Sequence, residues 1–171
     1  MEVREAILKR RSIRKFNPEP IDKEIITKIL EAGHWAPSEG NLQPWFFYVV
    51  ENIELRKALA KAALNQEFII QAPVAIVVCA DLEKTAPYGK RGKELFCLQS
   101  TAAAIQNMLL FAYSLGIGSC WVGAFNEAEA QLIMNLPANL RPLAIIPLGY
   151  PAETGRARRT NLNDKIKWMQ E

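Results

Sequence analysis

Hydrophobic and polar residues follow one another along the chain in blocks that predict alternating strands and helices. Short runs rich in β-branched, aliphatic and aromatic residues predict strands at residues 45–50, 74–80, 119–125 and 143–148. Longer amphipathic or apolar segments predict helices at residues 2–9, 22–32, 55–64, 95–115 and 127–136. This alternation favours a sheet covered by helices on both faces, and by itself it favours parallel strands.

Local signals indicate where some of these elements begin and end. Asp22 is a typical N-cap for the second helix, and Gly33 is a typical stop signal at its end. Residues 34–45 contain two prolines, a glycine, a serine and an asparagine, which predicts a loop. A charged link, residues 81–94, precedes the longest helix. Because we find no repeat and no second domain in the pattern, we expect a single domain over residues 1–171.

The longest helix lies in a stretch, residues 95–126, that has no formally charged residue. A membrane-spanning helix needs about 20 mostly apolar residues, so the stretch is long enough to be one. Polar residues interrupt it, however, and residues 116–118 (GIG) would break the helix. We therefore expect no membrane association and a helix that is buried on nearly all sides. In so small a protein, this burial suggests that a second subunit covers one face.

Composition indicates a globular protein of a reducing compartment. Half of the 171 residues are hydrophobic, and the mean hydropathy is −0.03. Cys79, Cys97 and Cys120 lie in apolar segments, so we expect buried free thiols. The first residues are charged and lack the apolar core of a secretory signal, and we expect a cytoplasmic protein. The net charge of +3 is low for a nucleic-acid binder, and one histidine, His34, excludes a multi-histidine metal site in one chain.

Residues 10–16, RRSIRKF, place three arginines and a lysine at the end of the first predicted helix. Cations in the last helical turn complement the negative end of the helix dipole, which accounts for Arg10 and Arg11. Ser12 and the residues after it favour an end of the helix before Arg14, so Arg14 needs another explanation. Guanidinium groups bind phosphate through paired hydrogen bonds, and a phosphate site is therefore the alternative.

The usual catalytic signatures are missing from the chain. It contains no phosphate-binding P-loop, no G-x-G-x-x-G after a strand and no G-x-S-x-G elbow. One histidine and no acidic pair at an informative spacing disfavour hydrolytic chemistry. A protein with so few acid–base groups can still be an enzyme if a cofactor carries the reaction.

Five segments, taken together and in this order, resemble FMN-dependent nitroreductases: RRSIRKF, APSEGNLQPWFF, NQEFIIQAPVAIVVCA, QNMLLFAYSLGIGSCWVGAF and PLGYPAETGRARR. The resemblance covers nearly the whole chain. It implies an α+β fold, a three-layer α/β/α sandwich around a mixed, largely antiparallel sheet, and we follow it rather than the parallel interpretation. It also implies a homodimer with FMN at the subunit interface and NADH or NADPH as the electron donor.

The resemblance further implies which positions bind the cofactor. They are Arg10, Arg11, Ser12 and Arg14; Pro37, Ser38, Glu39, Asn41 and Gln43, in a loop that reaches the flavin of the partner subunit; Asn65, with Gln66 as a nearby substitute; Trp121, Val122, Gly123 and Ala124; and Arg156, Arg158 and Arg159. No catalytic acid or base and no metal are expected. Arg14 would stabilise negative charge on the reduced flavin, and the backbone N–H of Gly123 would face the hydride-accepting nitrogen.

Without the resemblance, simpler interpretations stay open. The late arginines could form a solvated basic tail, residues 37–43 a surface loop, and residues 116–125 a buried strand with tight turns. Two departures from the family pattern also matter. Ser100 stands where many relatives have an acidic residue, and the 81–94 link is short, which predicts a more open pocket.

The sequence thus predicts an FMN-dependent oxidoreductase that transfers two electrons from NADH or NADPH to a small-molecule acceptor by a ping-pong mechanism. Nitroaromatics, quinones and similar compounds are the expected acceptors. The first alternative is specialised flavin chemistry on the same fold, namely dehydrogenation, dehalogenation or breakdown of the flavin. The others are a flavin-binding protein without turnover and a nucleic-acid-binding module, whose affinity would fall steeply with salt.

Overall fold

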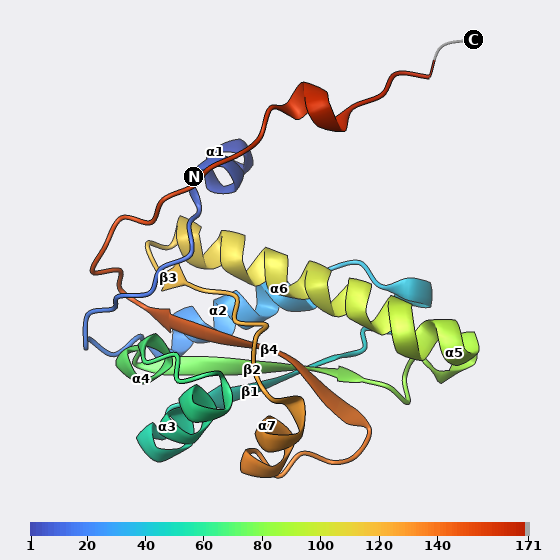
Figure 1. Ribbon diagram of the computed structural model, residues 1–171, viewed down its shortest axis with the longest axis horizontal. Helices are drawn as coiled ribbons and strands as arrows, with labels where there is room; N and C mark the ends of the chain where they lie inside the picture. The colour runs from blue at the N-terminus through green and yellow to red at the C-terminus, as the bar shows by residue number, and fades with distance from the viewer. Residues whose placement is uncertain (170–171) are drawn as a thin grey trace.

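A computed structural model of the chain describes residues 1–169 and contains a four-stranded sheet between two layers of helices (Figure 1). The strands are β1 (Trp45–Val50), β2 (Val74–Asp81), β3 (Gly118–Ser119) and β4 (Leu140–Gly149). The α-helices are α1 (Val3–Lys9), α2 (Lys23–His34), α3 (Ile53–Ala62), α4 (Phe68–Gln71), α5 (Gly89–Arg91), α6 (Cys97–Ser114) and α7 (Glu127–Ile133). Short turns of other helix types are η1 (Glu39–Asn41), η2 (Ala86–Tyr88), η3 (Gly92–Phe96) and η4 (Leu162–Lys165).

The sheet has the order β1-β2-β4-β3, and all of its strand pairs are antiparallel. The α+β expectation is therefore confirmed, and the parallel sheet that alternation alone favours is wrong. Val50, the last residue of β1, pairs with Ala75 near the start of β2. Two helices, α3 and α4, lie between these strands rather than one. The chain therefore re-enters the sheet at the end where it left, which makes β2 antiparallel to β1.

The two faces of β2 explain the three layers, because successive side chains of a strand point to opposite sides. Ile76 and Val78 belong to a core with residues of α2 and α6. Val77 and Cys79 belong to a second core with residues of α3 and α7. Since both faces are covered, β2 is apolar along nearly its whole length.

Helix α6 is buried on one side only, so the expectation of burial on nearly all sides is wrong for a single chain. The residues Ser100, Ala104, Ile105, Met108 and Ala112 are buried, whereas Gln99, Gln106 and Phe111 are exposed. By length and composition alone, the helical run Ala86–Ser114 could cross a membrane, and 44% of its most apolar window is buried in the protein. Its buried residues pack against α2 and the sheet, which is the usual reason for a core helix to be apolar.

At the boundaries of α2, the predicted N-cap is confirmed and the predicted stop signal is wrong. The side chain of Asp22 accepts a hydrogen bond from the backbone N–H of Glu24 at 2.8 Å, which confirms the N-cap. Gly33 does not end the helix. A Cβ at Gly33 would lie 2.7 Å from Cγ of Met108 in α6, so glycine serves the close approach of the two helices.

The strand expected at residues 119–125 is the least accurate prediction. Regular pairing ends after Ser119, and the chain meets β4 again only at an isolated bridge between Val122 and Ile145. Gly123 and Ala124 are exposed. The residues beyond β3 therefore run along the sheet edge with their backbone open on one side.

An ion pair ties the start of α7 to β4. Nε and Nη2 of Arg141 donate to the two carboxylate oxygens of Glu127 at 2.8 and 2.9 Å. The hydrogen bond from Arg141 lowers the pKa of Glu127 below its usual range, so the stabilisation is present at neutral pH and is lost as the pH falls through that lowered pKa.

We expect Glu127→Gln to lower the free energy of unfolding by less than about 1 kcal/mol at pH 7, because 47% of the Glu127 side chain is open to water. The difference should shrink as the pH falls through the lowered pKa of Glu127, because protonated Glu127 is uncharged like the glutamine. Urea denaturation at pH 7 and over a series of lower pH values measures it. A difference that persists unchanged at low pH would rule out this electrostatic origin.

Candidate functional site

The two ends of the chain meet beside the sheet edge formed by β3 and β4. The backbone N–H of Ile13 donates to the carbonyl of Ser119 at 2.9 Å, and that of Ala152 donates to the carbonyl of Lys15 at 2.9 Å. An isolated bridge pairs Phe16 with Pro151. Residues 10–16 are thereby held alongside the segment that follows β4 (Figure 1).

This arrangement brings cations from both ends together. Arg10 is half-buried. Burial lowers the pKa of Arg10, and the positive charges of Arg159 and Arg11 lower it further. Arginines that repel one another in this way form a favourable site for an anion, because a phosphate relieves the repulsion and accepts their hydrogen bonds.

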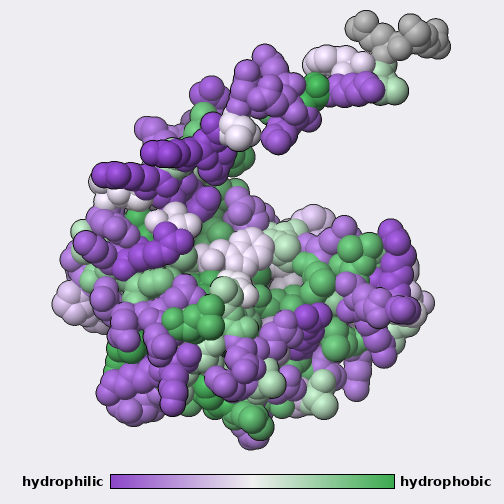
Figure 2. Space-filling model, viewed as in Figure 1, coloured by the Kyte–Doolittle hydropathy of each residue, from purple (hydrophilic) through white to green (hydrophobic). Residues whose placement is uncertain are grey.

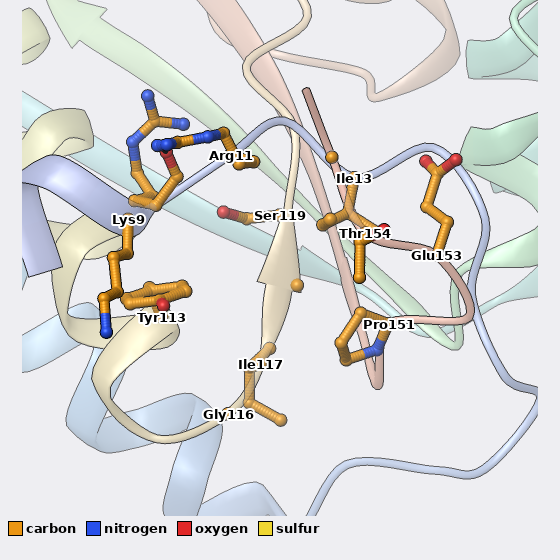
Figure 3. Close-up of a pocket in the computed structure, with 13 residues that line it drawn as sticks. Lys9, Arg11, Ile13, Tyr113, Gly116, Ile117, Ser119, Pro151, Glu153 and Thr154 are labelled. Carbon is orange, nitrogen blue, oxygen red and sulfur yellow. Dashed lines mark hydrogen bonds between the residues drawn. The ribbon is translucent and has the colours of Figure 1, made fainter. Parts of the chain in front are cut away.

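A cavity of about 400 Å³ opens beside these residues, as Figure 3 shows. It is lined by Lys9, Arg10, Arg11, Ile13, Tyr113, residues 116–119, Pro151 and residues 153–155. Cationic side chains from the end of α1 therefore face apolar and small residues from the end of α6 and from β3.

Arg11 supports both interpretations of the RRSIRKF segment. Its Nη1 donates to the carbonyls of Leu8 and Arg10 at 2.6 and 2.8 Å, so it completes the end of α1 as the helix-dipole interpretation predicts. Arg11 also lines the cavity. A Cβ added at Gly155 would lie 2.5 Å from the Cβ of Arg11. Glycine at position 155 thus allows the C-terminal segment to pass close to Arg11.

Ser12 and Arg14 lie on the side of the segment that faces Cys120. Burial raises the pKa of the Cys120 thiol, whereas the charge of Arg14, a hydrogen bond from Ser12 and the charge of Arg10 oppose this rise. The guanidinium carbon of Arg14 is 5.8 Å from the ring centre of Phe68. The three predicted residues Arg10, Ser12 and Arg14 thus all act on the Cys120 thiol, whereas only Arg10 among them lines the cavity.

The predicted cofactor-binding residues 121–124 lie near Gln66, the neighbour of the predicted residue Asn65. Nε2 of Gln66 donates to the carbonyl of Ala124 at 3.1 Å, so the turn after α3 touches the segment that follows β3. Asn65 is exposed and has a left-handed backbone, with a φ of 59°. Trp121 is 39% exposed, and Val122 is buried.

The predicted loop, residues 37–43, lies elsewhere in the same chain. Its Glu39 contacts Ser100 near the start of α6, whereas the cavity lies beside Tyr113 near the end of that helix. Ser100 and Tyr113 are 13 positions apart on the helix, which corresponds to about 20 Å. We call Arg10, Arg11 and Arg159 the arginine cluster. Within one chain, the predicted loop residues Pro37, Ser38, Glu39, Asn41 and Gln43 therefore do not reach this cluster.

The late arginines are only partly joined to the cluster. The charge of Arg159 acts on Arg10, and its Nη1 donates to the carbonyl of Arg158 at 2.9 Å. Arg156 and Arg158 are exposed on the tail. Of the three, Arg159 alone has a described interaction with the N-terminal arginines among residues 1–169.

Sequence reasoning missed Glu153. Its Oε1 accepts a hydrogen bond from the backbone N–H of Arg14 at 2.6 Å and so fixes the two chain ends relative to each other. Its position in the PAETGRARR segment, next to a cluster of arginines, was the only signal available. Tyr113, in the cavity wall, carried no signal because an aromatic residue near the end of an apolar helix is ordinary core.

Comparison with known proteins identifies relatives over nearly the whole chain. A profile of the nitroreductase family matches residues 7–66 and 61–150. A protein of Methanothermobacter thermautotrophicus, assigned as an NADH dehydrogenase or NAD(P)H nitroreductase, is 38% identical over 98% of this chain and 88% of its own. An FMN reductase [NAD(P)H] of Bacillus subtilis is 30% identical over 89% of this chain and 67% of its own.

Solved structures agree in fold. A protein of Desulfovibrio desulfuricans, assigned as a nitroreductase and crystallised with FMN, superposes with a TM-score of 0.87 at 33% identity and covers 100% of this chain and 98% of its own. Less similar relatives have other activities. An iodotyrosine deiodinase of Haliscomenobacter hydrossis is 26% identical over 94% of this chain and 84% of its own. A 5,6-dimethylbenzimidazole synthase of Rhodobacter capsulatus is 27% identical over 85% of this chain and 81% of its own.

Proposed function

Because this chain belongs to the nitroreductase family, we propose that it is an FMN-dependent oxidoreductase that takes electrons from NADH or NADPH. It would form one FMN-binding domain over residues 1–171, of which the last two lie outside the described residues. The relative crystallised with FMN and the FMN reductase of Bacillus subtilis both support this cofactor. The observation that carries the proposal is the cavity in which Arg10 and Arg11, from one end of the chain, face residues 153–155 from the other end.

The residues around this meeting point fit a flavin phosphate. The phosphate group of FMN carries nearly two negative charges and offers three acceptor oxygens, which match several guanidinium groups. Arg10 and Arg159 would bind it, with Arg11 at the edge of the cavity and Ser12 donating its hydroxyl. Arg156 and Arg158 lie in the same tail, within a few residues of Arg159, and would add charge.

The segment after β3 suits the flat ring of a flavin. Among residues 1–169, no atom beyond Gly123 and its two chain neighbours lies within 4 Å of the position that a Cβ of Gly123 would take, so a planar ligand can approach the backbone there. Trp121, Val122, Ala124 and Asn65 would contact the ring edges, and Arg14 would stabilise negative charge on it. Bound FMN would supply the two-electron chemistry, and no side chain is required as a catalytic acid.

The site is completed, in this proposal, by a second copy of the chain. The 37–43 loop cannot reach the arginine cluster of its own subunit, so its Pro37, Ser38, Glu39, Asn41 and Gln43 would contact the flavin of the partner. Apolar side chains exposed on α1, on the end of α6 and on the tail are Val3, Ile7, Leu8, Phe111, Leu115, Leu162, Ile166, Trp168 and Met169. Figure 2 shows the tail as an arm that stands apart from the body. Contact with a second subunit would remove such surfaces from water.

The acceptor would be a nitroaromatic, a quinone or a similar flat, reducible molecule. Donor and acceptor would use the same ring face in turn, which gives a ping-pong mechanism. A second candidate function is the specialised flavin chemistry of the deiodinase and the 5,6-dimethylbenzimidazole synthase, to which the chain is similar at lower identity. Product identification by mass spectrometry, after reduced flavin and oxygen are supplied, separates the two.

A visible absorption spectrum tests the proposal. We expect purified protein, after addition of FMN and removal of the excess, to keep a flavin band that bleaches when NADH or NADPH is added without oxygen. Light scattering in the same sample would give twice the chain mass of 19.2 kDa. Protein that retains no flavin would contradict the proposed function, and protein that retains flavin but is not reduced would indicate a binding protein.

A further inference from the structure

The loop formed by residues 37–43 has an intrinsically unfavourable backbone conformation. Asn41 and Gln43 have φ values of 57° and 51°, and Gly40 has a φ of 49°. A left-handed backbone is unfavourable for residues with a Cβ. Contacts from outside or within the loop must therefore maintain this conformation.

The first contact comes from helix α6. The hydroxyl of Ser100, a residue that is only 6% exposed, donates a hydrogen bond to Oε2 of Glu39. Oε1 of Glu39 is also buried and has no partner among the described residues. The carboxylate of Glu39 is thus directed onto α6 of its own chain, and the contact of Glu39 with a flavin stays a prediction.

The second contact comes from the charged link, on the other side of the loop. A Cβ at Gly40 would lie 2.6 Å from the hydroxyl oxygen of Tyr88, so the tyrosine packs directly on the loop backbone. The Tyr88 ring is itself held edge-on against Phe96, with ring centres 5.5 Å apart. The short link therefore supports the loop, which is a role that its length alone did not suggest.

A third contact lies within the loop. The backbone N–H of Gln43 donates to the hydroxyl of Ser38 at 2.9 Å, and Nε2 of Gln43 donates to the carbonyl of Asn41 at 3.0 Å. These bonds close the loop but do not attach it to the rest of the protein. Of the contacts described, the hydrogen bond between Ser100 and Glu39 is the one that links the loop to the core helix.

We propose that Ser100 is a positioning residue for flavin binding: through its hydrogen bond to Glu39 it fixes the 37–43 loop in the shape that contacts the flavin of the partner subunit. The inference rests on the proposed function. It also explains what Ser100 contributes where an acidic residue could stand. An acid at position 100 would face the buried carboxylate of Glu39, and two like charges there would push the loop away from α6.

The test compares variants at position 100 by fluorescence titration with FMN. We expect Ser100→Ala to weaken FMN binding about tenfold, the effect of losing a hydrogen bond to a charged group. Ser100→Asp should weaken it at least as much. Ser100→Thr keeps a hydroxyl and should stay within about threefold of the original protein. Ser114→Ala is the matched control, because Ser114 is on the same helix and its hydroxyl donates to the carbonyl of Phe111, within that helix.

A double variant separates positioning from a general loss of stability. In Ser100→Asp/Glu39→Gln, the amide N–H of the new side chain at position 39 can donate to the carboxylate at position 100. We expect this pair to regain most of the FMN affinity that Ser100→Asp loses, and to restore the visible circular dichroism of the bound flavin. If Ser100→Asp does not fold, Ser100→Ala and Ser100→Thr still provide the comparison.

The outcomes distinguish this inference from the proposed function. If the original protein does not bind FMN, the proposed function fails, whatever position 100 does. If the original protein binds FMN and the Ala and Asp variants bind it equally well, the inference is overturned. Equal losses in Ser100→Ala and Ser114→Ala would overturn it too, because they would show an effect of the helix and not of the loop.

Discussion

Arg10→Glu is expected to weaken FMN binding by about a hundredfold or more. The substitution removes a guanidinium that is half-buried beside Arg159 and Arg11 and puts a carboxylate in its place. Losing a charge-assisted hydrogen bond to phosphate and adding repulsion together correspond to about 3 kcal/mol or more. Equilibrium dialysis or quenching of flavin fluorescence measures the dissociation constant.

Lys15→Glu is the matched control for this experiment. It makes the same change of charge five residues further along, at a side chain that is exposed and is not placed in the site. We expect its affinity for FMN to stay within about threefold of the original, because exposed charges at a distance are screened by salt. If the two variants lose affinity equally, the effect is one of overall charge, and Arg10 has no specific role.

Arg56→Met is expected to lower the free energy of unfolding by about 3 kcal/mol. Arg56 in α3 is 7% exposed, and its Nη1 donates to the carbonyl of Ile70 at 2.8 Å and to the carbonyl of Ala72. Methionine fills similar space but donates no hydrogen bond. The two carbonyls, which connect α4 to the start of β2, would then be left without this donor in a buried setting.

Lys57→Met provides the comparison, since Lys57 is the next residue of α3, is 52% exposed and pairs with Glu54 on the same helix. We expect it to change the free energy of unfolding by no more than about 0.5 kcal/mol. Urea denaturation followed by circular dichroism measures both variants. An unchanged midpoint for Arg56→Met would show that water replaces the guanidinium at no cost.

The two expectations concern different parts of the molecule and fail independently. Arg56 lies in the helical layer formed by α3 and α4, away from the cavity beside Arg10, whose lining residues do not include it. Loss of FMN binding in Arg10→Glu with an unchanged unfolding transition would identify the arginine cluster as a binding site. The reverse pattern is expected for Arg56→Met, provided that FMN binding is measured well below its unfolding transition.

Local patterns in the sequence were sufficient for most helices and strands. The apolar runs at residues 45–50 and 74–80 became β1 and β2, and Asp22 starts α2 as its residue type predicts. Clustered arginines at residues 10–14 suggested a phosphate site as an alternative to pairing with the helix dipole, and this stays a prediction. These features depend on residues close together in the chain, whose backbone preferences and hydrogen bonds act within one or two turns.

Tertiary structure alone decided how these pieces meet. The antiparallel direction of β2, the continuation of α2 through Gly33 and the early end of β3 each depend on contacts with distant segments. The approach of Arg159 to Arg10 joins residues that lie 149 positions apart, and Ser100 meets Glu39 across 61 positions. Such pairings depend on the summed packing of the whole core, and no local period or cap encodes that sum.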